Sequence, residues 1–209
     1  MGDVGTDLSE ELRTFLLAQP CFFVASAPLG RGGRVNVSPK GLDTLRVLGP
    51  RECAYLDLTG SGNETSAHVL ENGRLTIMAC SFGERPRILR LYGRGAVHLP
   101  DSPRWAELRS AFGDAEGVRQ IITLAIERVQ TSCGYGVPRM EFQGHRPTLT
   151  RWAETRGDAG LARYRAEKNA VSIDGLPTHL ASPPASGDLG PRRRRRTDPP
   201  AAELTPPAD

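Results

Sequence analysis

Long apolar runs and paired cysteines are both missing from this chain of 209 residues. Its longest apolar stretch falls far short of the roughly 18 residues that a helix needs to span a bilayer. Residues 1–19 have neither the basic segment nor the long apolar segment of a secretory signal peptide. We therefore expect a cytoplasmic protein with no membrane segment.

Cysteine is scarce and scattered, and no group of histidines and cysteines has the spacing of metal ligands. Cys21, Cys53 and Cys80 lie in apolar runs, where a free thiol behaves as a small hydrophobic group. We expect reduced core residues here, with a disulfide or a reactive thiol as the alternative. Because no Ser-His-Asp spacing occurs either, the sequence predicts neither a metal site nor a protein nucleophile.

Neither sign of charge dominates, because 27 Lys and Arg residues are set against 24 Asp and Glu residues, for a net charge of +3. Residues 1–180 are close to neutral, so the sequence predicts no broad basic face for nucleic acid. Aromatic residues, at 6%, indicate a modest core. The length suits one domain followed by a tail.

The last part of the chain, residues 181–209, is rich in proline and has no apolar periodicity. Such a segment cannot bury enough apolar surface to offset the entropy lost on ordering. We therefore expect a disordered tail after a folded domain of residues 1–180 that ends in helices. The arginine run at residues 192–196 has the charge of a nucleic-acid or membrane tether, but acidic residues lie nearby, and we interpret it as solvated.

Apolar periodicity predicts mostly strands, which come from neighbouring parts of the chain and are interrupted by a few short helices. We expect Asp7 or Ser9 to cap the first helix, Gly73 to end the second, and Gly157 to break the last. This order favours a mainly β protein with short helices (α+β), and an antiparallel barrel rather than a sheet of βαβ units. The expected strands are residues 21–27, 34–38, 53–58, 74–81, 87–99 and 120–129, and the helices after the first are 65–72, 102–111 and 148–169.

Three polar side chains alternate along the expected strand that begins at Arg34 and ends in Ser-Pro-Lys-Gly. Side chains on one face of a strand are two residues apart, so Asn36 and Ser38 share a face. Lys40 lies just beyond them. A strand that merely ends in a turn explains Pro39 and leaves Lys40 as a solvated charge. A planar polar ligand, by contrast, needs donors and acceptors at fixed spacing along its edge, and this strand provides them.

A glycine-rich loop links the expected strand 53–58 to the helix 65–72. Hydroxyls and free backbone N–H groups at a helix start can hold a phosphate, because the helix dipole favours negative charge there. The loop also fits an ordinary connection in which Ser61 or Asn63 caps the helix. Glu64 opposes a phosphate, since its carboxylate already satisfies the dipole. The phosphate hypothesis uses the side chains of Thr59, Ser61, Asn63, Thr65 and Ser66.

Together the two segments resemble the flavin-binding split barrels of the pyridoxamine 5'-phosphate oxidase-like family. The likeness rests on Arg-Val-Asn-Val-Ser-Pro-Lys-Gly at residues 34–41 and on Gly-Asn at 62–63, which leads into a short helix ending in Glu-Asn and a strand that begins with Arg74. It covers residues 20–99 well, and residues 132–138 and 169–177 resemble one subgroup. The resemblance implies a split β-barrel of the FMN-binding type with FMN as cofactor.

In this family the flavin lies in a cleft between two subunits, so the resemblance also implies a homodimer. Asn36, Ser38 and Lys40 would line the edge of the flavin ring, and the loop and helix start would hold the phosphate. The implied function is that of an FMN-binding oxidoreductase, which passes hydride or electrons through the flavin. The substrate is unknown, because the part that recognises pyridoxal phosphate in the vitamin B6 oxidase has no counterpart here.

One departure from the family pattern concerns the phosphate. Where the family commonly has two basic ligands, this chain has Glu64, Thr65 and Ser66. That removes charge-assisted hydrogen bonds worth about 1.5–3 kcal/mol each. Lys40, Arg90 or Arg94 can substitute for them. The weakened phosphate site leaves two alternatives open: a deazaflavin-dependent reductase, and a non-catalytic module that binds flavin or haem.

Overall fold

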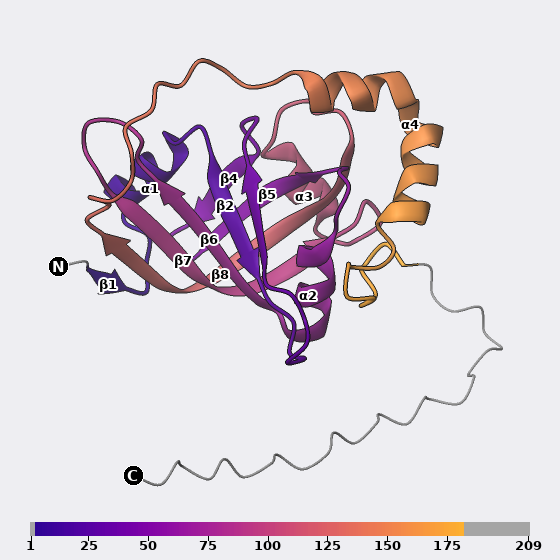
Figure 1. Ribbon diagram of the computed structural model, residues 1–209, viewed down its shortest axis with the longest axis horizontal. Helices are drawn as coiled ribbons and strands as arrows, with labels where there is room; N and C mark the ends of the chain where they lie inside the picture. Colours follow the sequence, from indigo (N-terminus) through magenta and orange to yellow (C-terminus); the bar gives the residue numbers. More distant parts are fainter. Residues whose placement is uncertain (1–2, 182–209) are drawn as a thin grey trace, which may run out of the picture.

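All strand pairings in the computed structural model, which describes residues 3–181, are antiparallel (Figure 1). The sheet has the order β3-β2-β6-β7-β8-β5-β4, and β1 pairs with β8. The strands are β1 (Val4–Gly5), β2 (Phe22–Ser26), β3 (Asn36–Lys40), β4 (Leu45–Gly49), β5 (Glu52–Leu58), β6 (Arg74–Cys80), β7 (Ile88–His98) and β8 (Val118–Ser132). The helices are α1 (Glu10–Leu17), α2 (Glu64–Asn72), α3 (Trp105–Ser110) and α4 (Thr148–Lys168).

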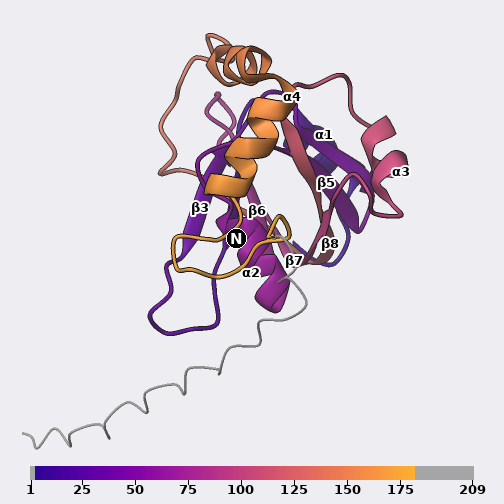
Figure 2. The ribbon, with the colours of Figure 1, turned by 90° about the vertical axis from the view of Figure 1, so that its right-hand side faces the viewer.

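The sheet curls so that its two ends approach each other. β3 lies at one end, and β5 and β4 lie at the other. Even so, Lys40 Nζ on β3 is 2.7 Å from Asp57 Oδ1 on β5. Side chains thus connect the two ends at this point, and Figure 2 shows α4 crossing the same side of the molecule. The architecture is the predicted mainly β split barrel with short helices.

β5 is buried on both faces, because its side chains alternate between two apolar clusters. Tyr55 packs with Ile77 and Leu91 in the larger cluster, which fills the barrel. Leu56 packs with Leu108 of α3 in the smaller cluster on the opposite face. Full burial of one such side chain contributes about 1.5–3 kcal/mol. β5 is therefore a rigid support for the polar residue that follows, Asp57.

Two predicted helix ends and one predicted helix break are confirmed. The Ser9 side chain accepts a hydrogen bond from the Leu12 N–H and caps α1. Gly73 ends α2 in the left-handed region, with φ of 71°. Gly157 breaks α4 with φ of 60° and ψ of 175°, so α4 is two helical pieces across a kink.

The strands near the site differ in part from the prediction. β3 begins two residues later than expected and continues through Pro39, which lies opposite Phe23 of β2. An edge strand tolerates this proline, because its missing N–H can lie on the unpaired side. The sequence did not predict β4, which is only five residues long and shifts register against β5 between Val47 and Gly49.

All four cysteines are free, and Cys53 and Cys80 are buried in the core as predicted, whereas Cys21 is only partly buried. Cys133 is exposed. Within residues 3–181 there is no helix with the length and apolar character needed to cross a membrane. The predicted tail, with its arginine run at residues 192–196, lies outside the described residues from residue 182 onward.

Candidate functional site

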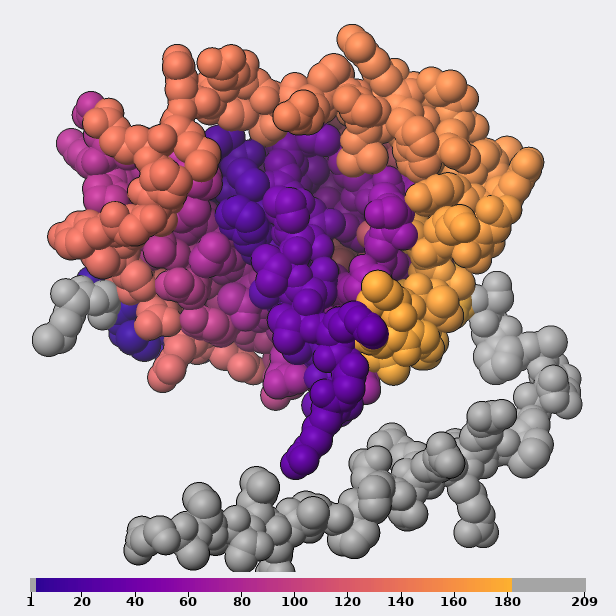
Figure 3. All heavy atoms as spheres, viewed as in Figure 1, coloured from indigo at the N-terminus to yellow at the C-terminus, as the bar shows by residue number. Residues whose placement is uncertain are grey.

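A polar cavity of about 370 Å³ lies where the end of β3 faces the start of α2. Its walls come from β3, β5, the glycine-rich loop and the beginning of β8, and Leu149 of α4 lines it too. Figure 3 shows the later part of the chain, in orange and yellow, folded around this face of the molecule. The charged and polar side chains that line the cavity are Ser38, Lys40, Thr44, Asp57, Ser61, Asn63, Glu64, Thr65 and Arg119.

The predicted site residues fall into three groups. Ser38, Lys40, Ser61, Asn63 and Thr65 line the cavity, although they come from segments separated by β4 and β5. A second group, Asn36, Thr59 and Ser66, does not line it but makes polar contacts close to its wall. The third group is Arg90 alone, which does not line the cavity.

The centre of the cavity wall is a buried carboxylate, Asp57, that is held by two cations. Its Oδ1 lies 2.7 Å from Lys40 Nζ, and its Oδ2 lies 2.8 Å from Arg119 Nε. Gln120 Nε2 also donates to Oδ2, at 2.7 Å. The side chains of Asp57 and Arg119 are 3% and 4% exposed. Water screens such a group weakly, so its charge is set by its neighbours.

Two opposing influences act on the pKa of Asp57. Burial alone raises the pKa of a carboxyl group, because a low-dielectric surrounding disfavours the charged form. Lys40 and Arg119 lower it, through their charges and their hydrogen bonds, and they outweigh the burial. The pKa of Asp57 therefore lies well below its ordinary value, and the carboxylate stays ionised at neutral pH.

A row of hydrogen bonds connects β3 to the first turn of α2. Ser38 Oγ donates to Asn36 Oδ1 at 2.9 Å, and Asn36 Nδ2 donates to Thr65 Oγ1 at 3.0 Å. Asn36, Ser38 and Lys40 are partly buried, whereas Val35 and Val37 are 72% and 62% exposed. The polar face of β3 thus points into the molecule, and the apolar face points out. The alternation predicted from the sequence is confirmed.

Two of the predicted phosphate ligands are already bonded within the protein. The Thr59 hydroxyl donates to the Gly117 carbonyl at 2.7 Å and accepts from Arg165 Nε at 2.9 Å. Ser66 is fully buried, and its Oγ accepts the His179 N–H at 3.1 Å and lies 3.0 Å from His179 Nδ1. Their hydroxyls are therefore bonded to Gly117 after α3, to Arg165 of α4 and to His179 after α4.

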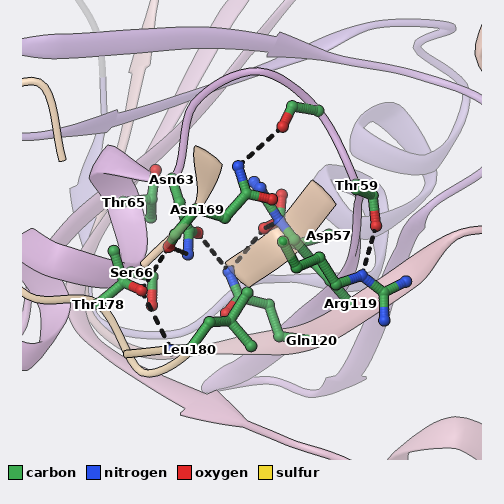
Figure 4. Close-up of polar contacts among 12 residues, drawn as sticks. Asp57, Thr59, Asn63, Thr65, Ser66, Arg119, Gln120, Asn169, Thr178 and Leu180 are labelled. Atoms are coloured by element: carbon green, nitrogen blue, oxygen red, sulfur yellow. Dashed lines mark hydrogen bonds and ion pairs between the residues drawn. The ribbon is translucent and has the colours of Figure 1, made fainter. Parts of the chain in front are cut away.

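Asn63 is engaged on both sides of its amide (Figure 4). Its Nδ2 donates to the Asn169 carbonyl at 3.0 Å, and its Oδ1 accepts from Gln120 Nε2 at 2.9 Å. As a result, Asn63 makes no side-chain capping bond to the start of α2, although it occupies the N-cap position. The first-turn N–H groups of α2 lack the cap that this residue type usually supplies.

Glu64 lies at the first position of α2 and lines the cavity. Its Oε1 accepts the Ile173 N–H at 3.2 Å, so the carboxylate is tied to the segment after α4. The opposition between Glu64 and a phosphate, expected from the sequence, therefore persists in the structure. The repulsion between Glu64 and a phosphate is reduced because the Glu64 carboxylate is bonded to the Ile173 N–H.

Arg90 does not line this cavity. It lies on β7, opposite Met78 of β6 and Gln130 of β8. Its Nη1 donates to Ser132 Oγ at 3.1 Å. In the described residues of one chain, Arg90 is thus not brought together with the other predicted ligands.

Three buried polar residues of the site were not found from the sequence. Asp57 and Gln120 are direct neighbours in the pairing of β5 with β8, and Arg119 precedes Gln120. One signal in the sequence could have identified them. An acidic residue and an Arg-Gln pair lie at the ends of two otherwise apolar runs, where apolar residues are expected. A buried polar group needs a partner, and these residues are one another's partners.

A second cavity, of about 670 Å³, adjoins the first at Pro39, Lys40 and Gly41. It lies between the end of α1, the turn after β6 and residues 140–146. Phe142 and His145 form an edge-to-face pair in its wall, with ring centres 5.0 Å apart. Its lining is mostly apolar, in contrast to the charged lining of the first cavity.

The chain matches the family model described as "Pyridoxamine 5'-phosphate oxidase" over residues 8–133. It is also 44% identical, over 187 residues, to "Pyridoxamine 5'-phosphate oxidase family protein ustO" of Aspergillus flavus. That alignment covers 81% of this chain and 75% of the relative. The chain therefore belongs to the pyridoxamine 5'-phosphate oxidase family.

The fold has counterparts among solved structures. HupZ from Group A Streptococcus, in a variant form, matches with a TM-score of 0.50 and 20% identity, over 60% of this chain and 99% of that one. An FMN-binding protein from Syntrophomonas wolfei matches with a TM-score of 0.42 and 11% identity, over 56% of this chain and 80% of that one. The first likeness concerns the fold alone, and the second is too distant to support an argument.

Proposed function

We propose that this protein binds FMN at the end of β3 and uses it as the redox cofactor of an oxidoreductase. The observation that carries the proposal is the junction of two cavities of opposite character at Pro39, Lys40 and Gly41. The charged cavity suits a phosphate, and the larger apolar cavity suits a flat ring system. Membership of the pyridoxamine 5'-phosphate oxidase family supports the same ligand.

The residues that line the charged cavity have the chemistry needed to hold FMN. Ser61 and Thr65 offer hydroxyls at the start of α2, where the helix dipole also favours an anion. Ser38 offers a polar edge on β3. When bound, FMN supplies hydride or electron transfer through its ring, while the protein supplies position and polarity. Lys40, fixed by Asp57, stabilises negative charge on a ligand that lies along β3.

Residues on the outer face of β3 support a homodimer. Val37 of the edge strand β3 and Val35, just before that strand, are largely exposed, and apolar side chains there favour contact with another protein surface. We expect light scattering on the eluting protein to give twice the monomer mass. A monomer at all concentrations would contradict this part of the proposal.

A deazaflavin is the second candidate cofactor. The observation that favours it is the internal use of Thr59, Asn63 and Ser66, which leaves fewer free donors for a phosphate than the sequence suggests. The same observation favours a non-catalytic module that binds flavin or haem. We place both behind FMN, because the cavity still contains Lys40, Ser61 and Thr65.

The first experiment is an absorbance spectrum of the purified protein before and after reconstitution with FMN, with any released cofactor identified by mass. We expect one FMN per subunit. Recovery of a deazaflavin would establish the second candidate. A haem spectrum would favour the binding module. A protein that stays colourless after reconstitution would contradict the proposal.

A further inference from the structure

One cation of the cavity has donor capacity that the protein itself does not use. Arg119, the second residue of β8, has a side chain only 4% exposed. Its Nε donates to Asp57, but its Nη1 is buried and has no hydrogen-bond partner among residues 3–181. Buried donors are almost always satisfied, and more so when they carry charge. The unpaired Nη1 therefore indicates a missing acceptor.

The location of Arg119 identifies the kind of acceptor. Arg119 lines the same cavity as Lys40 and the loop that leads into α2. Asp57 pairs with both cations, so the cluster of Lys40, Arg119 and Asp57 carries one excess positive charge. Glu64, the other acidic residue that lines the cavity, brings the formal charge of the lining to zero, and its Oε1 accepts a hydrogen bond from the Ile173 N–H.

The start of α2 borders the same cavity as Arg119. Asn63 makes no capping bond, because Gln120 and Asn169 occupy its amide. Thr65 lines the cavity with its hydroxyl held by Asn36. A helix start without a side-chain cap and a guanidinium with one unpaired N–H group, Nη1, thus border one cavity, and both are suited to an oxyanion.

We propose that Arg119 is the cation that binds the phosphate of the ligand, in place of basic residues at positions 64–66. The inference rests on the proposed function, in that FMN supplies the phosphate. The guanidinium then uses Nε for Asp57 and Nη1 for a phosphate oxygen. The charge missing from the start of α2 is supplied from β8, which register places beside Asp57.

The test compares FMN with riboflavin, which has the same ring and lacks the phosphate. Both are titrated by fluorescence quenching against the wild type, Arg119→Gln and Arg119→Lys, and melting curves confirm folding. Arg128→Gln, an exposed arginine on the same strand, is the matched control. We expect Arg119→Gln to weaken FMN by tenfold to a hundredfold, with riboflavin changed less than twofold and Arg128→Gln without effect.

Equal weakening of FMN and riboflavin would assign Arg119 to the support of Asp57 alone and would overturn the inference. So would an unchanged preference for FMN. We expect Arg119→Lys to keep part of that preference, because it keeps the charge. If Arg119→Gln does not fold, Arg119→Lys still tests the inference, because a loss of part of the preference for FMN is expected there too.

A second measurement separates this inference from the proposed function. Inorganic phosphate, as probe, should raise the melting temperature of the full-length wild type, and the rise should be lost in Arg119→Gln and reduced in Arg119→Lys. If FMN fails to bind but phosphate stabilises the wild type through Arg119, the proposed function fails and the anion site stands. If FMN binds and phosphate has no effect dependent on Arg119, the inference fails and the cofactor assignment stands.

Discussion

Asn63 at the start of α2 donates its side-chain N–H to the main-chain carbonyl of Asn169, at the end of α4, over 3.0 Å. Asn169 Nδ2 in turn donates to the Gly60 carbonyl at 2.9 Å. The Thr178 hydroxyl donates to the Asn169 carbonyl at 2.6 Å. The glycine-rich loop is thus held in shape by residues more than a hundred positions later in the chain. Its geometry is not a local property of the loop.

We expect Asn169→Ala to destabilise the protein and to loosen the loop. Asn169 is fully buried, and its loss leaves the Gly60 carbonyl without this donor. We expect the free energy of unfolding to fall by about 1–3 kcal/mol, measured by denaturant titration. The nearby, exposed Glu167→Ala should change it by less than about 0.5 kcal/mol. Equal effects of the two variants would show that Asn169 does not hold the loop.

Lys40→Ala should weaken flavin binding. Lys40 is the only cation of β3 at the cavity, and loss of a charge-assisted contact of about 1.4 kcal/mol corresponds to a tenfold loss of affinity. Fluorescence titration with FMN measures this, and Lys168→Ala, on the exposed end of α4, is the control. An unchanged affinity would remove Lys40 from the binding site.

Glu64→Arg should tighten FMN binding and leave riboflavin binding unchanged. The change replaces an anion at the start of α2 with a cation, at the position where the proposed phosphate meets the helix. Two charge effects of about 0.3–1 kcal/mol each correspond to a gain of about threefold to thirtyfold in affinity. Glu71→Arg makes the same charge change near the other end of α2 and should not tighten binding. Weaker FMN binding in Glu64→Arg would place the phosphate elsewhere.

Stability at acid pH should depend on Asp57. Its pKa in the folded protein is lowered below the value of about 3.9 expected for the unfolded chain, since Lys40 and Arg119 favour the carboxylate over the opposing effect of burial. The unfolded state therefore binds the proton first, so the contribution is complete above the unfolded value, declines below it, and is lost as the pH falls through the lower pKa of the folded protein. Breaking this buried cluster by Asp57→Asn should cost about 3 kcal/mol at pH 7. In urea titrations from pH 7 to pH 2, we expect the difference between wild type and variant to shrink below about pH 4. A difference that stays constant over that range would contradict the ionised state of Asp57.

Several parts of the fold were predictable because their causes are local. The polar face of β3, the cap at Ser9 and the left-handed Gly73 each depend on residues within one strand or turn. The same is true of the kink at Gly157. The family resemblance, carried by residues 34–41 and 62–75, agrees with the match over residues 8–133. Most of the strand pattern and the candidate cavity followed from these signals.

The rest depends on register and on distant contacts, which one sequence does not display. Asp57 meets Gln120 because β5 and β8 pair in one register, and a shift by one residue would turn Asp57 to the other face. Thr59 and Ser66 have the residue types of phosphate ligands, but Arg165 and His179 reach them from the C-terminal part of the domain. Arg90 has the charge expected of a substitute ligand, but β7 directs it to Ser132. Residue type alone did not distinguish these outcomes.

The hydrogen bonds between Asn169 and the glycine-rich loop also bear on how the protein folds during translation. Strands β1 to β8 leave the ribosome before α4 and the residues that follow it, since a chain emerges from its N-terminus and domains fold as they appear. Until residues 169–179 are present, Asn63 lacks its bond to Asn169, and Ser66 lacks its bonds to His179. The barrel can therefore collapse around its core before its ligand cavity takes shape, and the cavity is completed last, when translation of the folded domain is nearly finished.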